Sequence, residues 1–153
     1  MDRPSVSPAL TLEAVILTLG LKPHPEGGFY REMHRVDAPE GQRSLGTAIY
    51  YALGRGDRSH WHRVDAVEIW HFYAGAPLEL SIAADGESDP QAHVLGAALG
   101  AGQRPQVIVP KGHWQSAVST GDWTLVGCTV SPGFEFSGFE MAPPGWMPGG
   151  ETS

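Results

Sequence analysis

The sequence predicts an all-β barrel or jelly roll with one short N-terminal α-helix, and two observations support this. First, 20 glycines and 13 prolines divide the 153 residues into short segments. Second, those segments are rich in aromatic and β-branched residues, which favour strands. Many short strands close most economically as a barrel or jelly roll. We expect a single domain over residues 1–153, with an ordered core over about residues 10–142 and a frayed Pro/Gly-rich tail at 143–153.

A short amphipathic helix is expected close to the N-terminus. Its apolar positions recur at helical spacing: Leu12, Val15, Ile16 and Leu19. Ser7 or Thr11 is suited to cap the first turn, because a side-chain oxygen can accept a hydrogen bond from the amides there. Gly20 is placed to end the helix. The single apolar face indicates a helix that packs on something larger.

Strands and turns account for the rest of the chain, after a Pro/Gly-rich loop that follows the helix. We expect strands at residues 29–35, 47–53, 58–64, 67–73, 78–83, 92–95, 106–109, 114–118, 123–130 and 135–141. The chain shows no internal repeat and no domain boundary.

Composition and charge exclude several classes of partner. Ten basic against seventeen acidic residues give a formal net charge of −7, without a Lys/Arg cluster, so nucleic acid is not an expected partner. Cys128 is the single cysteine, which excludes an intramolecular disulfide. With no secretory pattern at the N-terminus, we expect a cytoplasmic location. No apolar run approaches the roughly 20 residues that span a bilayer, so we expect no membrane partner.

The segment from Gly54 to Gly75 holds the residues that point to chemistry: His60, His62 and Glu68. Side chains alternate between the two faces of a strand, so the two histidines should share one face. A tight turn before Glu68 would then bring all three together. Two imidazoles and a carboxylate suit a divalent metal such as Zn, Fe, Ni or Mn, and they equally suit metal-free proton transfer.

This order of residues resembles the first motif of the cupins, which are small double-stranded β-helix barrels. In that motif a glycine, His-x-His, a glutamate and a second glycine follow one another. Gly54, His60, His62, Glu68 and Gly75 match it, although five residues separate His62 from Glu68 where the common motif has three or four.

A second cupin motif is recognisable over residues 107–115. Gln115 occupies the position of the last metal-binding histidine. The resemblance therefore implies a metal set of His60, His62 and Glu68 with Gln115 as a weak fourth ligand, because an amide oxygen can also bind a metal.

Four segments together resemble one uncharacterised branch of the cupins, Cupin_5, or domain of unknown function 985. They are residues 19–32, 47–53, 62–75 and 131–139. This branch implies a cupin barrel, usually a homodimer, with a pocket at the barrel mouth and no settled activity. It is similar in fold to keto-sugar epimerases and sugar isomerases, and fold alone assigns no chemistry.

Each candidate residue also has a purely structural interpretation. His62 could simply hydrogen-bond inside the barrel, and Glu68 could pair with an arginine such as Arg31 or Arg63. Glu26 could simply belong to a turn that connects the helix to the first strand, and Tyr30 could be an aromatic residue packed in the core. The tryptophans near the motifs, Trp70 and Trp114, could likewise be core residues or could stack on a ligand ring.

The sequence therefore predicts a pocket for a small polar molecule, most plausibly a carbohydrate or nucleotide-sugar derivative. As an isomerase or epimerase, His62 would remove a proton next to a carbonyl, and Tyr30 or Glu68 would return one. Glu26, Trp70, Trp114 and Gln115 are the expected ligand-binding residues. The alternatives are a non-catalytic carbohydrate-binding module with the same pocket and no turnover, or a metal-binding cupin of unknown activity. A third possibility is a storage or scaffold barrel.

Overall fold

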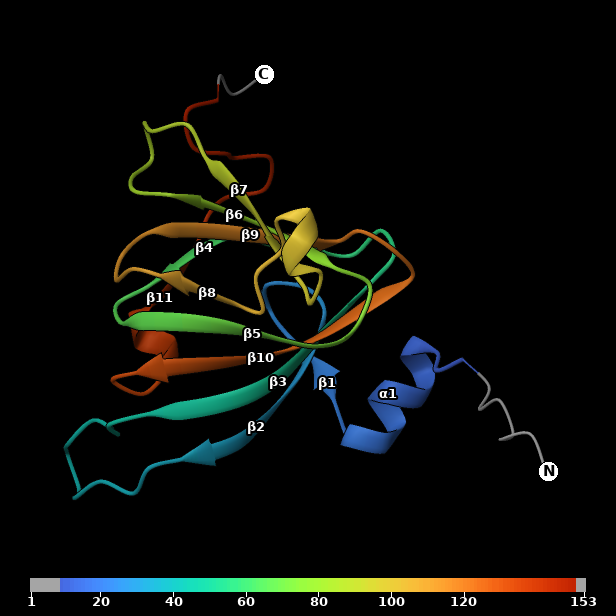
Figure 1. Ribbon diagram of the computed structural model, residues 1–153. Helices are drawn as coiled ribbons and strands as arrows, with labels where there is room; N and C mark the ends of the chain where they lie inside the picture. Colours follow the sequence, from blue (N-terminus) through green and yellow to red (C-terminus); the bar gives the residue numbers. More distant parts are fainter. Residues whose placement is uncertain (1–8, 151–153) are drawn as a thin grey trace.

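Two antiparallel sheets face each other in the computed structural model, which describes residues 9–150 (Figure 1). The first sheet, sheet A, holds six strands in the order β1 (Lys22–Pro23), β2 (Phe29–Arg35), β3 (Thr47–Gly54), β10 (Trp123–Ser131), β5 (Val67–Gly75) and β8 (Gln106–Val109). The second, sheet B, holds β11 (Phe139–Met141), β4 (Arg58–Val64), β9 (Trp114–Ser119), β6 (Leu78–Ala83) and β7 (Gln91–Leu95). The predicted all-β class is confirmed.

Helix α1 (Leu12–Leu19) lies beside sheet A and forms as its sequence predicts (Figure 1). Thr11 Oγ1 accepts a hydrogen bond from the Ala14 amide at 3.2 Å, which caps the first turn. Gly20 ends the helix in the left-handed conformation, at φ 68°. Buried Val15 anchors the apolar face against β3. Ser7, the other cap candidate, lies outside the described residues.

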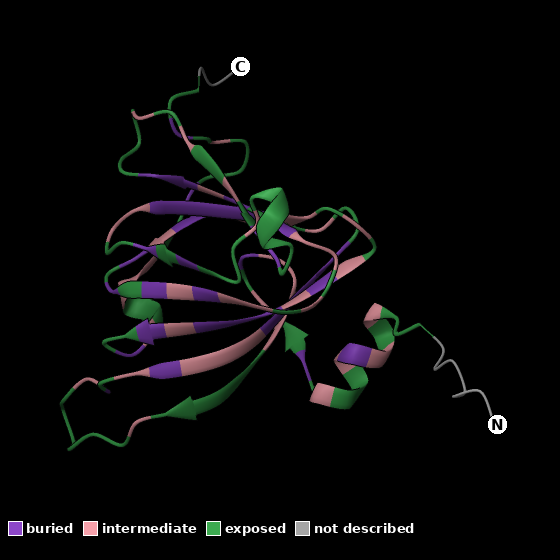
Figure 2. Ribbon diagram, viewed as in Figure 1, coloured by how far each residue is buried: buried purple, intermediate pink, exposed green. Residues whose placement is uncertain are grey.

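The main core lies between the two sheets, as the buried positions in Figure 2 show. Tyr51, Leu53, Leu80 and Val126 are fully inaccessible to solvent there, and Trp70 nearly so. Alternation along each strand sends one set of side chains inward and the other outward. The structure places His71 outside, where its ring Nε2 lies 3.1 Å from Thr129 Oγ1.

The last predicted strand is shorter than expected. Residues 135–141 were expected to be extended, but Phe136–Gly138 form a 3-10 turn, η2, and only Phe139–Met141 pair with β4. The Gly138 amide donates to the Glu135 carbonyl at 2.9 Å, which closes the turn. A second such turn, η1 (Leu99–Ala101), lies between β7 and β8.

The expectation of a frayed tail is wrong for residues 143–150. Trp146 packs on Trp114 with ring centroids 4.5 Å apart, and Pro148 is among the fully buried side chains. The Gly149 amide donates to the Gly86 carbonyl at 3.1 Å, which ties this end to the loop after β6. Aromatic burial outweighs the flexibility that the Pro/Gly composition suggested.

No helix within residues 9–150 is long and apolar enough to cross a membrane.

Candidate functional site

A cavity of about 320 Å³ opens between the inner face of sheet A and the β4–β11 edge of sheet B. Its polar lining comes mainly from the first third of the chain: Lys22, His24, Glu26, Tyr30, Arg31, Glu32, Arg35, Thr47, His62 and Glu68. Its apolar lining is Ile49, Val64, Val130, Phe134, Phe136 and Phe139. Pockets of this kind, mostly apolar with a few converging polar groups, are the usual sites for small ligands.

Strand register explains why β2 sends several polar side chains toward the cavity. Tyr30 pairs with Tyr51, Glu32 with Ile49 and Arg35 with Thr47. A bulge between Glu32 and His34 adds one residue to β2, so Arg35 returns to the face that Tyr30 and Glu32 share. Without the bulge, Arg35 would face away from the cavity.

Glu26 enters the cavity from the loop between β1 and β2, because two glycines let that loop run close to its neighbours. Gly27 and Gly28 have φ values of 107° and 73°. A Cβ at Gly27 would collide with the Arg58 carbonyl, and one at Gly28 would lie 2.7 Å from the Ala52 carbonyl. The two glycines therefore cannot be replaced without moving Glu26.

His62 and Glu26 form a buried ion pair at the base of the cavity. His62 Nε2 lies 2.8 Å from Glu26 Oε2, and His62 Nδ1 lies 2.7 Å from the carbonyl of His60. The carbonyl can only accept a hydrogen bond, so Nδ1 carries a proton. With Nε2 facing a carboxylate, both ring nitrogens are donors and the ring is an imidazolium.

The pKa values of the pair agree with this assignment. Burial lowers the pKa of His62, but the charge and hydrogen bond of Glu26, with help from Glu68, raise it to about 9. Burial raises the pKa of Glu26, but the charge and hydrogen bond of His62, together with His24 and Ser59, leave that pKa below its ordinary value. A doubly protonated ring cannot accept a proton, so this arrangement does not suit the predicted role of His62 as a general base near neutral pH.

His24 completes this group as a neutral imidazole. Its Nδ1 accepts a hydrogen bond from the Glu26 amide at 3.0 Å, and it lies 3.6 Å from Glu26 Oε1. Burial lowers the pKa of His24, Glu26 partly offsets this, and the His62 charge lowers the pKa further. An imidazole that accepts at Nδ1 holds its proton on Nε2.

Glu68 lies in the cavity wall opposite, on sheet A, at the end of a buried chain of hydrogen bonds. The amide nitrogen of Gln115 donates to Glu68 Oε1 at 2.8 Å, and the Trp70 indole donates to Gln115 Oε1 at 2.7 Å. Burial raises the pKa of Glu68, the His62 charge lowers it and the Glu26 charge raises it, with a result of about 7. This carboxyl group thus changes charge near neutral pH.

His60 does not join the site. A bulge between Ser59 and His62 in the β4–β9 pairing breaks the alternation that predicted a shared face. The His60 ring instead places Nε2 at 3.1 Å from the Ala142 carbonyl and 3.0 Å from the Pro143 carbonyl. It holds the chain after β11 in place.

The predicted metal set is consequently not assembled. His60 faces away, both polar ends of the Gln115 amide are hydrogen-bonded, and the His62 nitrogens are engaged with Glu26 and a carbonyl. Within residues 9–150 no three His, Cys, Asp or Glu side chains are placed to hold a metal ion. The residues present therefore do not fit the metal of the first cupin motif.

Two further predicted ligand-binding residues also lie elsewhere. Trp70 is 1% exposed and belongs to the main core. Trp114 points to the outer side of sheet B, where it packs on Trp146 and beneath the Arg63 guanidinium. Neither lines the cavity, and Gln115 acts behind Glu68. By contrast, Glu26, Tyr30, His62 and Glu68 are brought together in one cavity.

The sequence reasoning missed the cations and phenylalanines of the lining. Lys22 lies on β1, a strand that the sequence did not predict. β2 was predicted with correct bounds, but the bulge between Glu32 and His34 hides that Arg35 faces inward. Nothing in the spacing of Phe134, Phe136 and Phe139 distinguishes a cavity wall from a filled interior.

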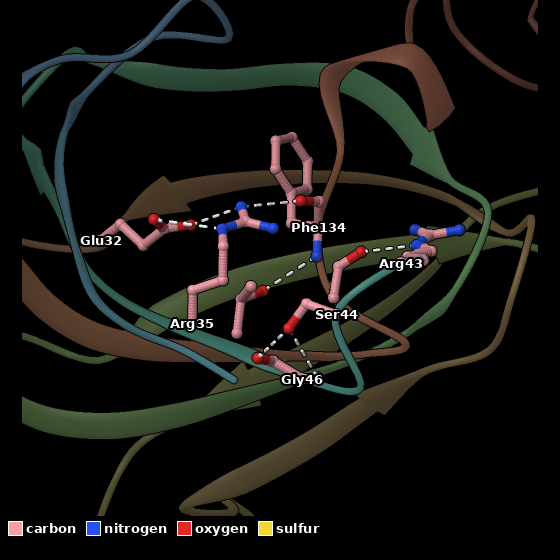
Figure 3. A network of polar contacts seen from close by, with 8 residues as sticks. Glu32, Arg35, Arg43, Ser44, Gly46 and Phe134 are labelled. Carbon is pink, nitrogen blue, oxygen red and sulfur yellow. Dashed lines mark hydrogen bonds and ion pairs between the residues drawn. The ribbon is translucent and has the colours of Figure 1, made fainter. Parts of the chain in front are cut away.

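A network of polar contacts fixes the segment between β10 and β11 as one wall of the cavity (Figure 3). Arg35 Nη2 donates to the Phe134 carbonyl at 2.9 Å, and the Phe134 amide donates to Thr47 Oγ1 at 3.0 Å. Arg43 Nε donates to the Gly133 carbonyl at 2.7 Å. These contacts hold the Phe134 ring against Phe136, with centroids 5.0 Å apart.

Comparison with known families identifies the fold. The model of the Cupin superfamily (DUF985), Cupin_5, matches residues 13–142. The chain belongs to this family. A crystal structure of a Shewanella oneidensis protein is 40% identical, with a TM-score of 0.82, and the match covers 88% of this chain and 85% of that one. A hypothetical protein from Leishmania major is 33% identical, with a TM-score of 0.76 and coverage of 87% and 88%.

More distant cupins share only the architecture. Oxalate decarboxylase from Bacillus subtilis is 15% identical, with a TM-score of 0.60, and the match covers 78% of this cupin and 29% of that enzyme. At this identity the similarity shows the fold alone. No curated protein matches the sequence of this cupin at a significant level.

Proposed function

We propose that the cavity is a proton-transfer site that isomerises or epimerises a small hydroxy-carbonyl compound such as a sugar. One observation carries the proposal: a buried carboxyl group, Glu68, shares a cavity with the ion-paired imidazolium of His62. Burial raises the pKa of this carboxyl group to about 7. A base whose pKa lies near the working pH is both available in its basic form and able to release its proton again.

Glu68 would remove the proton next to the substrate carbonyl. Gln115 donates to Oε1 of Glu68, which fixes the orientation of the carboxylate in the cavity wall. The electrons of the broken C–H bond move to the carbonyl oxygen, and the resulting enolate is negatively charged. For epimerisation, Tyr30 would return a proton to the opposite face of the same carbon, and the proton taken by Glu68 would go back to Tyr30 through solvent. For isomerisation, Glu68 would return its proton to the former carbonyl carbon, while the neighbouring hydroxyl group gives its proton to the former carbonyl oxygen, so that substrate and product contain the same atoms.

His62 would supply charge rather than a proton. Its ring is held by Glu26 and the His60 carbonyl, so it forms a fixed positive group beside the position where negative charge develops. Such preorganised charge in a cavity shielded from water is a large source of catalysis. The phenol of Tyr30 lines the same cavity and is the candidate donor to the carbonyl oxygen.

Hydrogen exchange tests this function directly. A panel of aldoses and ketoses is incubated with the protein in deuterated water, and deuterium on the carbon next to the carbonyl is followed by NMR. We expect exchange with the parent and a loss of about a hundredfold or more in Glu68→Gln. Glu79→Gln, an exposed substitution on β6, is the matched control and should keep the parent rate.

A binding module without turnover is the second candidate. One observation favours it: the group that contacts the Glu68 carboxyl is the neutral amide of Gln115, which also binds Trp70, and not a histidine that could transfer a proton. Saturable sugar binding with no exchange across the panel, in parent and variant alike, would establish this alternative and exclude the enzyme.

A further inference from the structure

Three of the chain's ten lysines and arginines line this one cavity, in a molecule whose formal net charge is −7. We call Lys22, Arg31 and Arg35 the cationic rim. Each lies near one side of the opening, on β1 or β2. A concentration of positive charge against the overall charge of a protein draws anions to that place.

The charge of Arg35 is neutralised by Glu32, so Arg35 has a structural role. Its Nη2 lies 2.6 Å from Glu32 Oε1 and also binds the Phe134 carbonyl (Figure 3). Glu32 is the acidic residue on the same part of the lining. The pair therefore adds little net charge to the opening.

Lys22 and Arg31 retain their charge. Among residues 9–150, neither lies within ion-pair distance of a carboxylate. Arg31 Nη1 donates to the Leu19 carbonyl at 3.1 Å, which orients the guanidinium and uses one of its five N–H groups. Gly20 leaves room for it, because a Cβ there would lie 3.2 Å from Arg31 Nη1.

Lys22 lies beside the Tyr30 ring, and Arg31 lines the same cavity. Lys22 Nζ is 5.4 Å from the centroid of the Tyr30 ring, and Arg31 follows Tyr30 on β2. The phenol faces the cavity that also contains Glu68 and His62. A ligand held by these two cations would thus extend past Tyr30 toward the proposed proton-transfer groups.

We propose that the ligand is a small hydroxy-carbonyl compound with a terminal oxyanion, either a phosphate or a carboxylate, that Lys22 and Arg31 bind. This rests on the proposed function for the chemistry at the other end of the ligand. Oxyanions suit the site because guanidinium and ammonium groups donate several charge-assisted hydrogen bonds to them. The cavity of about 320 Å³ lies at the small end of ligand pockets, which favours a sugar phosphate or sugar acid over a nucleotide-sugar.

Binding measurements with matched probes test this inference. Isothermal titration calorimetry gives the Kd of fructose 6-phosphate, fructose, glucuronate and inorganic phosphate. We expect the three anions to bind the parent and fructose to bind at least about tenfold more weakly than its phosphate. The ratio between fructose 6-phosphate and glucuronate then distinguishes phosphate from carboxylate as the preferred group.

Two variants and one control assign the effect to the rim. Lys22→Met and Arg31→Gln should each weaken binding of fructose 6-phosphate and of inorganic phosphate about tenfold. Arg55→Gln removes an exposed arginine paired with Asp122 outside the cavity and should leave every Kd unchanged. In the parent, the anion affinities should also fall as salt is added.

The inference is overturned if inorganic phosphate does not bind, if fructose and its phosphate bind equally, or if both rim variants bind like the parent. Glu68→Gln separates this inference from the proposed function. If that variant and the parent both bind anions but neither exchanges deuterium, the rim assignment stands and the proposed enzyme activity fails.

Discussion

At the scale of single residues, the site depends on how burial and charge compete in three side chains. Burial disfavours every charge in the cavity, yet His62 and Glu26 remain charged because each stabilises the other at 2.8 Å. Glu68 has no such partner, and burial raises its pKa to about 7. Glu26 and Glu68 thus have different protonation states in one cavity. Glu26 has a structural role in the ion pair, and Glu68 is the candidate for proton transfer.

The same pKa values make stability depend on pH. The His62 pKa is raised from 6.5 to about 9, so its contribution is complete below 6.5 and is lost as the pH rises through 9. The Glu26 pKa is lowered from 4.5, so its contribution is present above 4.5 and is lost on acidification. The raised pKa of Glu68 works in the opposite sense and lowers stability as the pH rises from 4.5 to about 7.

We therefore predict that Glu26→Gln is strongly destabilising and alters this pH profile. Removing the carboxylate leaves the His62 ring buried without its partner, which should cost about 3–5 kcal/mol of unfolding free energy near pH 6. The difference from the parent should shrink above pH 9, where His62 is neutral in both proteins. Urea unfolding across this pH range measures both effects.

Glu140→Gln is the matched control, because Glu140 pairs with Arg63 at an exposed position and such pairs contribute at most about 1 kcal/mol. Equal losses in the two variants, or a pH-independent loss in Glu26→Gln, would show that the Glu26–His62 ion pair does not stabilise the fold.

At the scale of elements, strand bounds could be predicted from sequence and strand irregularities could not. Hydrophobic alternation and turn residues fixed most strands and the helix. The bulges in β2 and β4 leave no comparable signal, and each one reverses the face of the residues that follow it. Glu26, Tyr30, His62 and Glu68, which the sequence grouped, line one cavity. The bulges explain why His60 was expected inside and why Arg35 was overlooked.

The sequence also could not predict side-chain contacts between segments that are distant along the chain. Trp70 and Gln115 were expected to face a ligand, but Gln115 accepts a hydrogen bond from Trp70 and donates one to Glu68 across the two sheets. The tail was expected to be loose on composition alone, whereas Trp146 finds Trp61 and Trp114 on sheet B. Neither arrangement follows from local sequence, because each depends on which strands become neighbours.

The packing of the tail leads to a prediction about stability. Trp146→Ala should reduce the unfolding free energy by about 3 kcal/mol, since it removes a large aromatic side chain from a buried cluster. Met147→Ala, at the adjacent position with 48% exposure, should cost less than about 1 kcal/mol. Urea denaturation of both variants measures this, and similar small losses would mean that the tail contributes nothing to the fold.

At the scale of the whole molecule, the passage of the chain from sheet B to sheet A between β4 and β5 creates the site. β4 belongs to sheet B and β5 to sheet A, so His62 and Glu68 reach one cavity from opposite walls although only five residues separate them. Membership in the Cupin superfamily (DUF985) accounts for this framework. The homodimer and the cytoplasmic location expected from the sequence stay predictions.

The most direct test of the account is an NMR titration of the intact protein, with ¹⁵N in the His62 ring and ¹³C in the Glu68 carboxyl group. We predict that His62 keeps both ring protons until the pH approaches 9, and that Glu68 titrates with a midpoint near 7. A His62 midpoint near 6.5 together with a Glu68 midpoint near 4.5 would contradict the account, because neither the fixed positive charge nor the neutral-pH base would then exist.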